Sequence, residues 1–198
     1  MPTYNPTIDV LLLCTANQCR SPMAEVLLRH HLEAAGVDAA VSSAGLYPGG
    51  SPATGHGVAA MADRGLDLSG HRSRQVDSSL LLLADLVIGM TREHVREATV
   101  LVPDVLHRAF TLKELVRLAR AAGPRGEGES LDGWLRRLVA DRTRADLLGV
   151  GHDDDYDVAD PVGRSRGDYE RTAALLDDLL AQVVALAFPA RRPEEQRA

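Results

Sequence analysis

The sequence predicts an α/β fold, a three-layer sandwich in which a four-stranded parallel sheet is flanked by helices. Short apolar runs alternate with helical patterns along the chain, which is typical of parallel, doubly wound sheets. The first run, residues 8–13, is almost continuously apolar, as expected of a strand buried on both faces. The chain has 198 residues, of which 45% are hydrophobic, and this is enough for one well-packed domain and short for two.

Three more short runs predict the remaining strands: residues 40–43, 85–90 and, more weakly, 105–110. Helical patterns separate them, at residues 23–35, 58–64, 80–83, 93–98 and 111–121. Ser21 and Pro22 look like a cap and a first helical residue, and Gly36 ends that helix. Thr111 is a candidate cap for the helix that follows it.

The last helix is expected over residues 168–188, with one apolar face to dock on the sheet. That face consists of Leu176, Leu179, Leu180, Val183 and Val184.

Residues 122–156 carry no strand signal, and we interpret them as an insertion or lid. Within them, residues 123–130 are loop-like and residues 131–148 predict a helix. The core is then formed by residues 8–120 and 157–187 of a single domain that spans the chain, 1–198. Residues 1–6 and 190–198 are expected to be loose termini.

The charge and the cysteine count narrow the function classes. The formal net charge is −6 and no Lys/Arg-rich run is present, so we expect neither a nucleic-acid partner nor a general basic surface. No signal peptide is evident, and the run at residues 10–13 is too short to span a membrane. With only two cysteines, a disulfide scaffold is not expected. We expect a cytoplasmic enzyme with reduced thiols and no membrane partner.

The strongest chemical signal is a loop that begins at Cys14, at the end of the first strand, and reaches Arg20 and Ser21 at the start of the first helix. Backbone N–H groups of residues 15–20 can surround a tetrahedral oxyanion, and the helix N-terminus adds partial positive charge. Arg20 offers a planar fork for two phosphate oxygens. This field should hold Cys14 as a nucleophilic thiolate that attacks phosphorus and forms a thiophosphate.

Other residues of the loop have supporting or alternative interpretations. Ser21 could donate a hydrogen bond to the thiolate when it leaves, and Asn17 could brace an unusual backbone conformation. Cys19 is either a small core residue or the partner of Cys14 in a reversible disulfide. The competing interpretation of the motif is a buried structural cysteine followed by an ordinary surface arginine.

Residues 8–21 resemble the low-molecular-weight protein tyrosine phosphatases, whose loop typically reads Cys-x-Gly-Asn-x-Cys-Arg-Ser. Further segments resemble this family in the same order, namely residues 42–45, 68–75, 90–94 and 160–161. The resemblance covers about residues 8–120 and 157–187 in all. The resemblance implies a phosphatase I-like fold and a bacterial member of the family. It also implies that Cys14 is the nucleophile, Arg20 the phosphate clamp and Asp160 the general acid.

The same resemblance assigns a supporting role to the residues around the nucleophile. Asn17, Ser21, Ser43 and His71 would form a hydrogen-bond network behind the loop. Substrate binding and loop support would involve these four together with Thr15, Ala16, Gln18 and Cys19.

The general acid is less certain from the residues alone. Pro161 favours an extended Asp160 at the tip of a shaped loop, but Asp157 and the run at residues 153–155 could compete with it. Only the family resemblance singles out Asp160. No metal or other cofactor is required for this chemistry, and no convincing metal-ligand spacing is present.

The loop departs from the family pattern at Ala16 and Gln18, and this departure bears on the choice of substrate. The aromatic residues that follow the Asp-Pro pair in eukaryotic members are missing, unless Tyr47 or Tyr156 replaces them. The partners expected are a phosphorylated protein or peptide and inorganic phosphate or other oxyanions, with phosphotyrosine as the first choice. The alternatives are a protein-arginine phosphatase, in which Thr typically replaces Gln18, an arsenate reductase that uses an external small thiol, and a non-catalytic phosphate-binding module.

Overall fold

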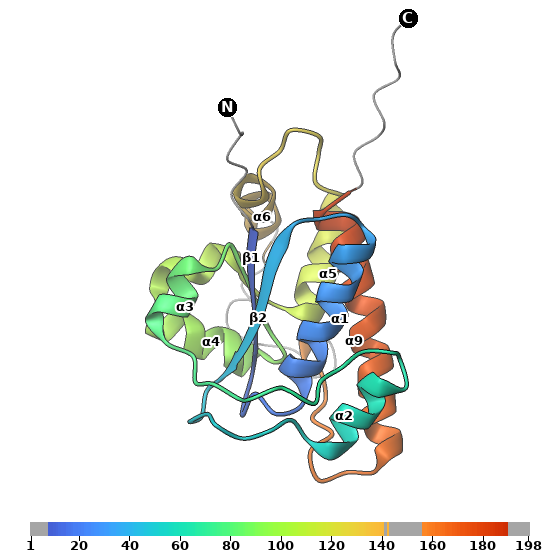
Figure 1. Ribbon diagram of the computed structural model, residues 1–198. Coiled ribbons are helices and arrows are strands. Elements are labelled where there is room, and N and C mark those ends of the chain that lie inside the picture. Colours follow the sequence, from blue (N-terminus) through green and yellow to red (C-terminus); the bar gives the residue numbers. More distant parts are fainter. Residues whose placement is uncertain (1–7, 141, 143–155, 190–198) are drawn as a thin grey trace, which may run out of the picture.

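Four parallel strands form one sheet in the order β2-β1-β3-β4 in the computed structural model, which describes residues 8–140, 142 and 156–189 (Figure 1). The strands are β1 (Ile8–Cys14), β2 (Ala39–Gly45), β3 (Leu86–Gly89) and β4 (Ala109–Thr111). β1, one of the two inner strands, pairs with β2 along its whole length and with β3 on its other side. The predicted four-stranded parallel sheet is therefore confirmed.

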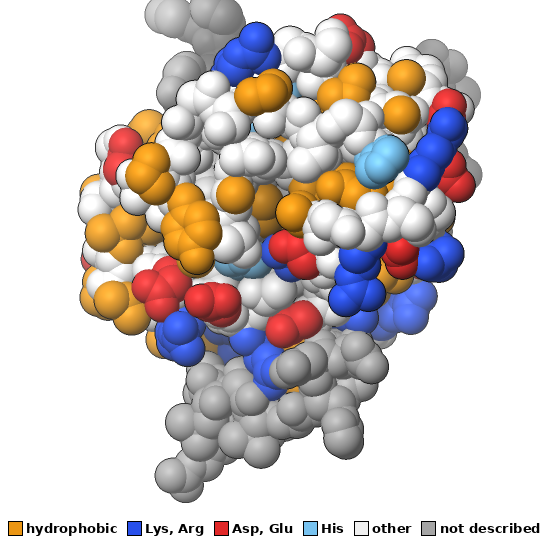
Figure 2. Space-filling model, turned by 90° about the horizontal axis from the view of Figure 1, so that it is seen from below, with side chains coloured by type: hydrophobic (Ala, Val, Ile, Leu, Met, Phe, Trp, Pro, Cys, Tyr) orange, Lys and Arg blue, Asp and Glu red, His pale blue; other side chains and the backbone are white. Residues whose placement is uncertain are grey.

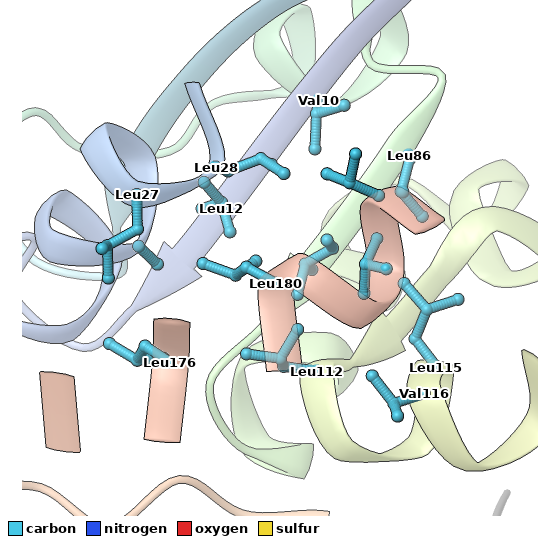
Figure 3. Packing of buried hydrophobic residues seen from close by; sticks show 14 of the residues in the cluster. Val10, Leu12, Leu27, Leu28, Leu86, Leu112, Leu115, Val116, Leu176 and Leu180 are labelled. Atoms are coloured by element: carbon cyan, nitrogen blue, oxygen red, sulfur yellow. The ribbon is translucent and has the colours of Figure 1, made fainter. Parts of the chain in front are cut away.

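Side chains of β1 alternate between two apolar cores, because successive residues of a strand point to opposite faces. Val10 and Leu12 lie in the larger core, and Leu11 and Leu13 lie in the smaller one. Figure 3 shows the larger core, where side chains of β1 meet those of three helices. Burial on both faces explains why this strand reads as a continuous apolar run.

Helices cover both faces of the sheet and complete the three layers (Figure 1). The larger core lies under α1 (Arg20–Ala34), α5 (Leu112–Ala122) and α9 (Arg166–Ala187). The smaller core lies under α3 (Ser78–Leu83) and α4 (Arg92–Leu101). The side chain of Leu179 is only partly buried, whereas the rest of the expected apolar face of α9 is buried.

Two further helices extend the larger helical layer. α2 (Gly55–Ala62) packs against α9, and α6 (Leu131–Ala140) buries Trp134, Leu135 and Leu138 in the larger core. The helix predicted over residues 131–148 is thus present in its first part, and residues 143–155 lie outside the described residues. The interpretation of residues 122–156 as an insertion or lid stays a prediction. None of the helices in the described ranges is both long and apolar enough to cross a membrane.

The fourth strand lies later in the chain than predicted. Residues 103–108 form a 3₁₀ helix, η1 (Pro103–Arg108), and the strand begins at Ala109. Pro103 stands at the start of this turn, where its fixed φ fits and its missing N–H costs nothing. Val105 lies within this 3₁₀ helix and its side chain is fully buried there, so an apolar residue at this position indicates burial and not a strand.

The cap predicted at Ser21 was also wrong. α1 begins at Arg20 with Cys19 as its N-cap, and the Ser21 hydroxyl donates to Cys14 Sγ instead of to the helix end. The cap predicted at Thr111 is confirmed, because its side chain accepts a hydrogen bond from the backbone N–H of Glu114 and the Glu114 carboxylate reaches back.

Candidate active site

The connections of the sheet diverge at the carboxyl ends of β1 and β3. The loop after β1 leads to α1 on one face, and the loop after β3 leads to α4 on the other. Ligands of open α/β sheets bind where neighbouring connections diverge in this way. Figure 2 looks onto this end of the molecule, where acidic and basic side chains stand next to apolar ones.

The carbonyl groups of the β1–α1 loop are held by neighbouring segments. The carbonyl of Thr15 accepts hydrogen bonds from the backbone N–H groups of Leu46 (2.8 Å) and Tyr47 (3.2 Å). The Asn17 carbonyl accepts from His71 Nε2 at 2.7 Å, and the Gln18 carbonyl accepts from the Thr54 N–H at 2.8 Å. The loop is therefore fixed through its acceptors.

Its donors, in contrast, are unused. Among the described residues, none of the backbone N–H groups of residues 15–19 donates to another protein group. The N-terminus of α1 carries no side-chain cap either. A row of unused N–H groups leading into a helix N-terminus is a ready site for a tetrahedral oxyanion.

Asn17 holds the loop in its unusual conformation. It has a φ of 53°, and among the described non-glycine residues only Asn17 has a positive φ. Its fully buried amide donates to Ser21 Oγ at 3.0 Å and to Ser43 Oγ at 2.8 Å, and accepts from the Arg74 N–H at 2.9 Å. Asn tolerates this left-handed region better than most residues. Ala16 does not adopt it, so the alanine in place of glycine introduces no strain there.

Cys14 is buried at the end of β1, with 3% of its surface exposed. Ser21 Oγ donates to its Sγ at 2.9 Å. Cys19 is equally buried, and burial, followed by the negative charge of Asp160, raises the pKa of its thiol to about 12. Both cysteines are free thiols, and Cys19 packs in the larger core. The reversible Cys14–Cys19 disulfide stays a prediction.

Arg20 and Asp160 meet although they are far apart in the sequence. Nη2 of the buried Arg20 lies 2.5 Å from Asp160 Oδ2, and Nη1 donates to the Val158 carbonyl at 3.0 Å. The Val158 N–H donates to the Met90 carbonyl at 2.8 Å, so the loop that carries Asp160 is docked on the end of β3. The Asp160 side chain is 43% exposed, which leaves it accessible from solvent.

Asp157, a competing candidate for the acid, has another contact. Its Oδ1 accepts from the Arg92 N–H at 2.9 Å at the start of α4, and lies 3.7 Å from Arg92 Nε. The other three competitors, at residues 153–155, lie outside the described residues. Of the acidic candidates that the structure describes, Asp160 is the one that faces Arg20.

The two candidate aromatic side chains lie in different surroundings. Tyr47 is 59% exposed and follows β2, where its own N–H binds the Thr15 carbonyl. The ring of Tyr156 faces two guanidinium groups, those of Arg92 and Arg117, at 5.1 and 5.9 Å from its centroid. The backbone of Tyr47 is thus bonded to the loop, and the replacement of the missing aromatic residues by either tyrosine stays a prediction. Gln18 is half-buried within the loop.

Sequence reasoning missed several residues that hold the loop. A Cβ added at Gly45 would lie 2.7 Å from the Asn17 nitrogen, so only glycine allows the end of β2 to approach the loop this closely. Ser43 donates to Glu25 at 2.6 Å, and Arg74 Nε donates to the Ser43 carbonyl at 2.8 Å. Gly45 and Arg74 lie in the segments 42–45 and 68–75 that resemble the family, but no role was assigned to them. Nothing in the sequence pointed to Glu25.

Among the described residues, no three or more His, Cys, Asp or Glu side chains lie close enough together to bind a metal ion. His31 lies 2.7 Å from Asp177 in a contact between α1 and α9.

Comparisons with known proteins agree with this geometry. The family model described as low molecular weight phosphotyrosine protein phosphatase matches residues 9–123. A curated relative, the protein-arginine-phosphatase of Bacillus subtilis (strain 168), is 32% identical over 89% of this chain and 94% of its own length.

Two solved structures are similar over almost their full length. The low molecular weight protein tyrosine phosphatase from T. tengcongensis has a TM-score of 0.68 and 29% identity, covering 90% of this chain and 98% of its own. The arginine phosphatase YwlE, in a mutant with a phosphorylated active-site serine, has a TM-score of 0.67 and 30% identity, covering 89% and 93%.

Proposed function

Since this chain belongs to the low molecular weight phosphotyrosine protein phosphatase family, we propose that it hydrolyses phosphotyrosine in proteins or peptides through a thiophosphate on Cys14. The observation that carries this proposal is the loop of unused N–H groups between Cys14 and Arg20. A dianionic phosphoryl group satisfies those donors and the helix N-terminus at once. The sulfur of Cys14 lies at the base of that loop, where it can reach phosphorus.

The first half-reaction transfers the phosphoryl group to the enzyme. The Cys14 thiolate attacks phosphorus, the bond from phosphorus to the phenolic oxygen breaks, and Asp160 gives its proton to that oxygen. Arg20, whose Nη2 lies 2.5 Å from Asp160 Oδ2, must release this carboxyl group to hold two phosphoryl oxygens, and the released group takes up from water the proton that it then gives to the phenolic oxygen. Binding of the substrate would thus release Asp160 from Arg20 at the same time as Arg20 binds the phosphoryl oxygens.

The second half-reaction returns the enzyme to its starting state. Asp160, now a carboxylate, takes a proton from water, the water oxygen attacks phosphorus, and the phosphorus–sulfur bond breaks. The departing Cys14 thiolate receives the hydrogen bond of Ser21, whose hydroxyl is held by Asn17. The phosphorylated serine in the active site of the related YwlE mutant supports a covalent intermediate at this position.

The nucleophile can be tested with p-nitrophenyl phosphate. We expect Cys14→Ser to abolish turnover while inorganic phosphate still binds, since the loop donors remain. Cys19→Ser serves as the matched control at the other cysteine and should retain turnover. Persistent turnover in Cys14→Ser would place the nucleophile elsewhere.

The acid can be tested by varying the leaving group. Asp160→Ala should slow aryl phosphates with poor leaving groups far more than those with good ones, because only the former need the proton. Asp157→Ala, in which the lost carboxylate contacts Arg92 instead, should affect both alike. Equal losses for good and poor leaving groups in Asp160→Ala would argue against acid catalysis at this residue.

A second candidate function is protein-arginine phosphatase activity. It is favoured by the Bacillus subtilis relative of that name, which matches over nearly the whole of this chain. Against it, Gln18 takes the place that Thr typically has in such enzymes. A side-by-side assay of a phosphotyrosine peptide, a phosphoarginine peptide and thiol-coupled arsenate reduction separates the three activities. The proposal of phosphotyrosine predicts the largest kcat/KM for the first.

The cellular setting belongs to the same proposal. We infer a cytoplasmic bacterial enzyme, since Cys14 must be a free thiol to act as the proposed nucleophile and the relatives described above are bacterial proteins. Phosphorylated proteins and free oxyanions are its proposed partners. The net charge of −6 gives no reason to add a nucleic acid.

A further inference from the structure

A buried histidine that the proposed chemistry does not use lies against the phosphate loop. His94, in the first turn of α4, is fully buried, and its Nε2 lies 3.1 Å from Thr15 Oγ1. Thr15 directly follows Cys14 in the chain. Its side-chain oxygen also lies 3.3 Å from Arg20 Nη2.

The hydrogen bonds fix the position of the imidazole proton. The Thr91 backbone N–H donates to Nδ1 at 2.9 Å, and a backbone N–H can only donate, so Nδ1 carries no proton. The neutral ring therefore carries its proton on Nε2, which must donate to Thr15. Burial, followed by the positive charge of Arg20, lowers the pKa of His94 to about 3, so the ring stays neutral at physiological pH.

The same reasoning fixes the hydroxyl of Thr15. Its oxygen accepts from His94 Nε2–H and from the guanidinium of Arg20, which can only donate. A hydroxyl has two acceptor lone pairs and one proton, so both lone pairs are used. The proton remains, and among the described residues no acceptor for it is present. Thr15 is thus held as a directed donor beside the Arg20 fork.

We propose that the Thr15 hydroxyl donates a hydrogen bond to a phosphoryl oxygen of the substrate, and that His94 is a positioning residue that forces this hydroxyl into the donor role. The inference rests on the proposed phosphatase function and extends it from the loop backbone to a side chain. An oxygen held by Arg20 Nη2 lies within reach of a hydroxyl that is bonded to the same Nη2. His94 links this donor to α4 and to the end of β3.

The test removes the hydroxyl while keeping the shape of the side chain. Thr15→Val should lower kcat/KM for p-nitrophenyl phosphate by about tenfold to a hundredfold, the usual effect of a hydrogen bond to a charged group. The inhibition constant of inorganic phosphate should rise with it. Thr15→Ser, which keeps the hydroxyl, should recover most of the loss. Thr99→Val is the matched control, since that hydroxyl binds the Val95 carbonyl away from the site.

The role of His94 is tested by coupling to Thr15. His94→Asn keeps an acceptor near Nδ1 for the α4 cap but has no donor that reaches Thr15, whereas His94→Gln places an amide N–H near the position of Nε2. We expect His94→Asn to lower kcat/KM in the wild-type background and to cause no further loss in the Thr15→Val background, with partial recovery in His94→Gln. A merely structural histidine would produce the same loss in both backgrounds, which would overturn the proposal.

The outcome can be separated from failure of the phosphatase assignment. If the wild-type protein binds inorganic phosphate by calorimetry but hydrolyses no phosphate ester, the proposed function fails, and phosphate affinity in Thr15→Val alone decides this inference. If the wild-type protein is active and Thr15→Val has the wild-type kcat/KM and phosphate affinity, only the inference fails. Thermal unfolding of each variant verifies that it is folded.

Discussion

Acid should destabilise this protein through His94, and replacing that residue should remove the effect. The imidazole is fully buried, and its pKa in the folded state is lowered to about 3. In the unfolded chain a histidine titrates near its ordinary pKa of about 6.5. Between these two values the unfolded chain binds a proton that the native protein does not, so stability falls as the pH decreases through this window.

The size of the effect follows from the two pKa values. Above a pH of about 6.5 neither state is protonated, and His94 contributes nothing to the pH dependence. Below it, each pH unit costs about 1.4 kcal/mol, so lowering the pH from 7.5 to 5.0 should cost about 2 kcal/mol through this residue alone. This is a measurable part of the 5 to 15 kcal/mol, roughly, that stabilises an ordinary domain.

The assay compares urea unfolding at the two pH values in three proteins. The wild type and His30→Gln, which replaces an exposed histidine, should lose stability equally on acidification. His94→Gln should lose about 2 kcal/mol less than either, because it has no imidazole to protonate. Groups common to all three proteins cancel in this comparison. Equal losses in the wild type and His94→Gln would show that His94 is not held neutral, and would refute the reasoning.

Three further predictions concern the loop itself. Gly45→Ala should lower kcat/KM by about a hundredfold, because the new Cβ would displace the backbone of Asn17, while Gly55→Ala, whose Cβ meets nothing within 4 Å, should leave it unchanged in the same assay. Ser21→Ala should make the phosphoenzyme accumulate in rapid-quench experiments, since the departing thiolate loses its hydrogen bond; an unchanged steady-state level would contradict this. Arg20→Lys keeps the charge but loses the fork that binds Val158 and Thr15, so phosphate affinity measured by calorimetry should fall by about tenfold or more; retention of affinity would show that charge alone suffices.

Much of the fold could be predicted because its signals are local. A continuous apolar run marks β1, since both faces of that strand are buried. The cap at Thr111 could be identified from the Glu three residues later, because the reciprocal hydrogen bonds of a capping box join neighbours in the chain. The position of β4 could not, because apolar Val105 is buried from a turn, and the sequence does not distinguish these two kinds of burial.

The candidate nucleophile and the anion loop were also evident from the sequence, because Cys14, Arg20 and the loop between them are contiguous. A strand, a loop and a helix start bring those residues together without help from the rest of the chain. The acid was different. Pro161 and the family resemblance favoured Asp160 over Asp157, but nothing local in the sequence placed either carboxylate near Arg20. The docking of Val158 on the end of β3 aims Asp160 at Arg20.

The sequence by itself therefore determined the sheet, the loop and the candidate residues for binding and attacking a phosphoryl group. Tertiary structure decided which partners those residues have: the candidate acid Asp160 opposite Arg20, the glycine that lets β2 approach, and the histidine next to Thr15. The physical reason is that short-range hydrogen bonds and periodicity depend on residues that are close in the sequence, whereas a contact between α4 and the β1–α1 loop depends on how separate elements pack.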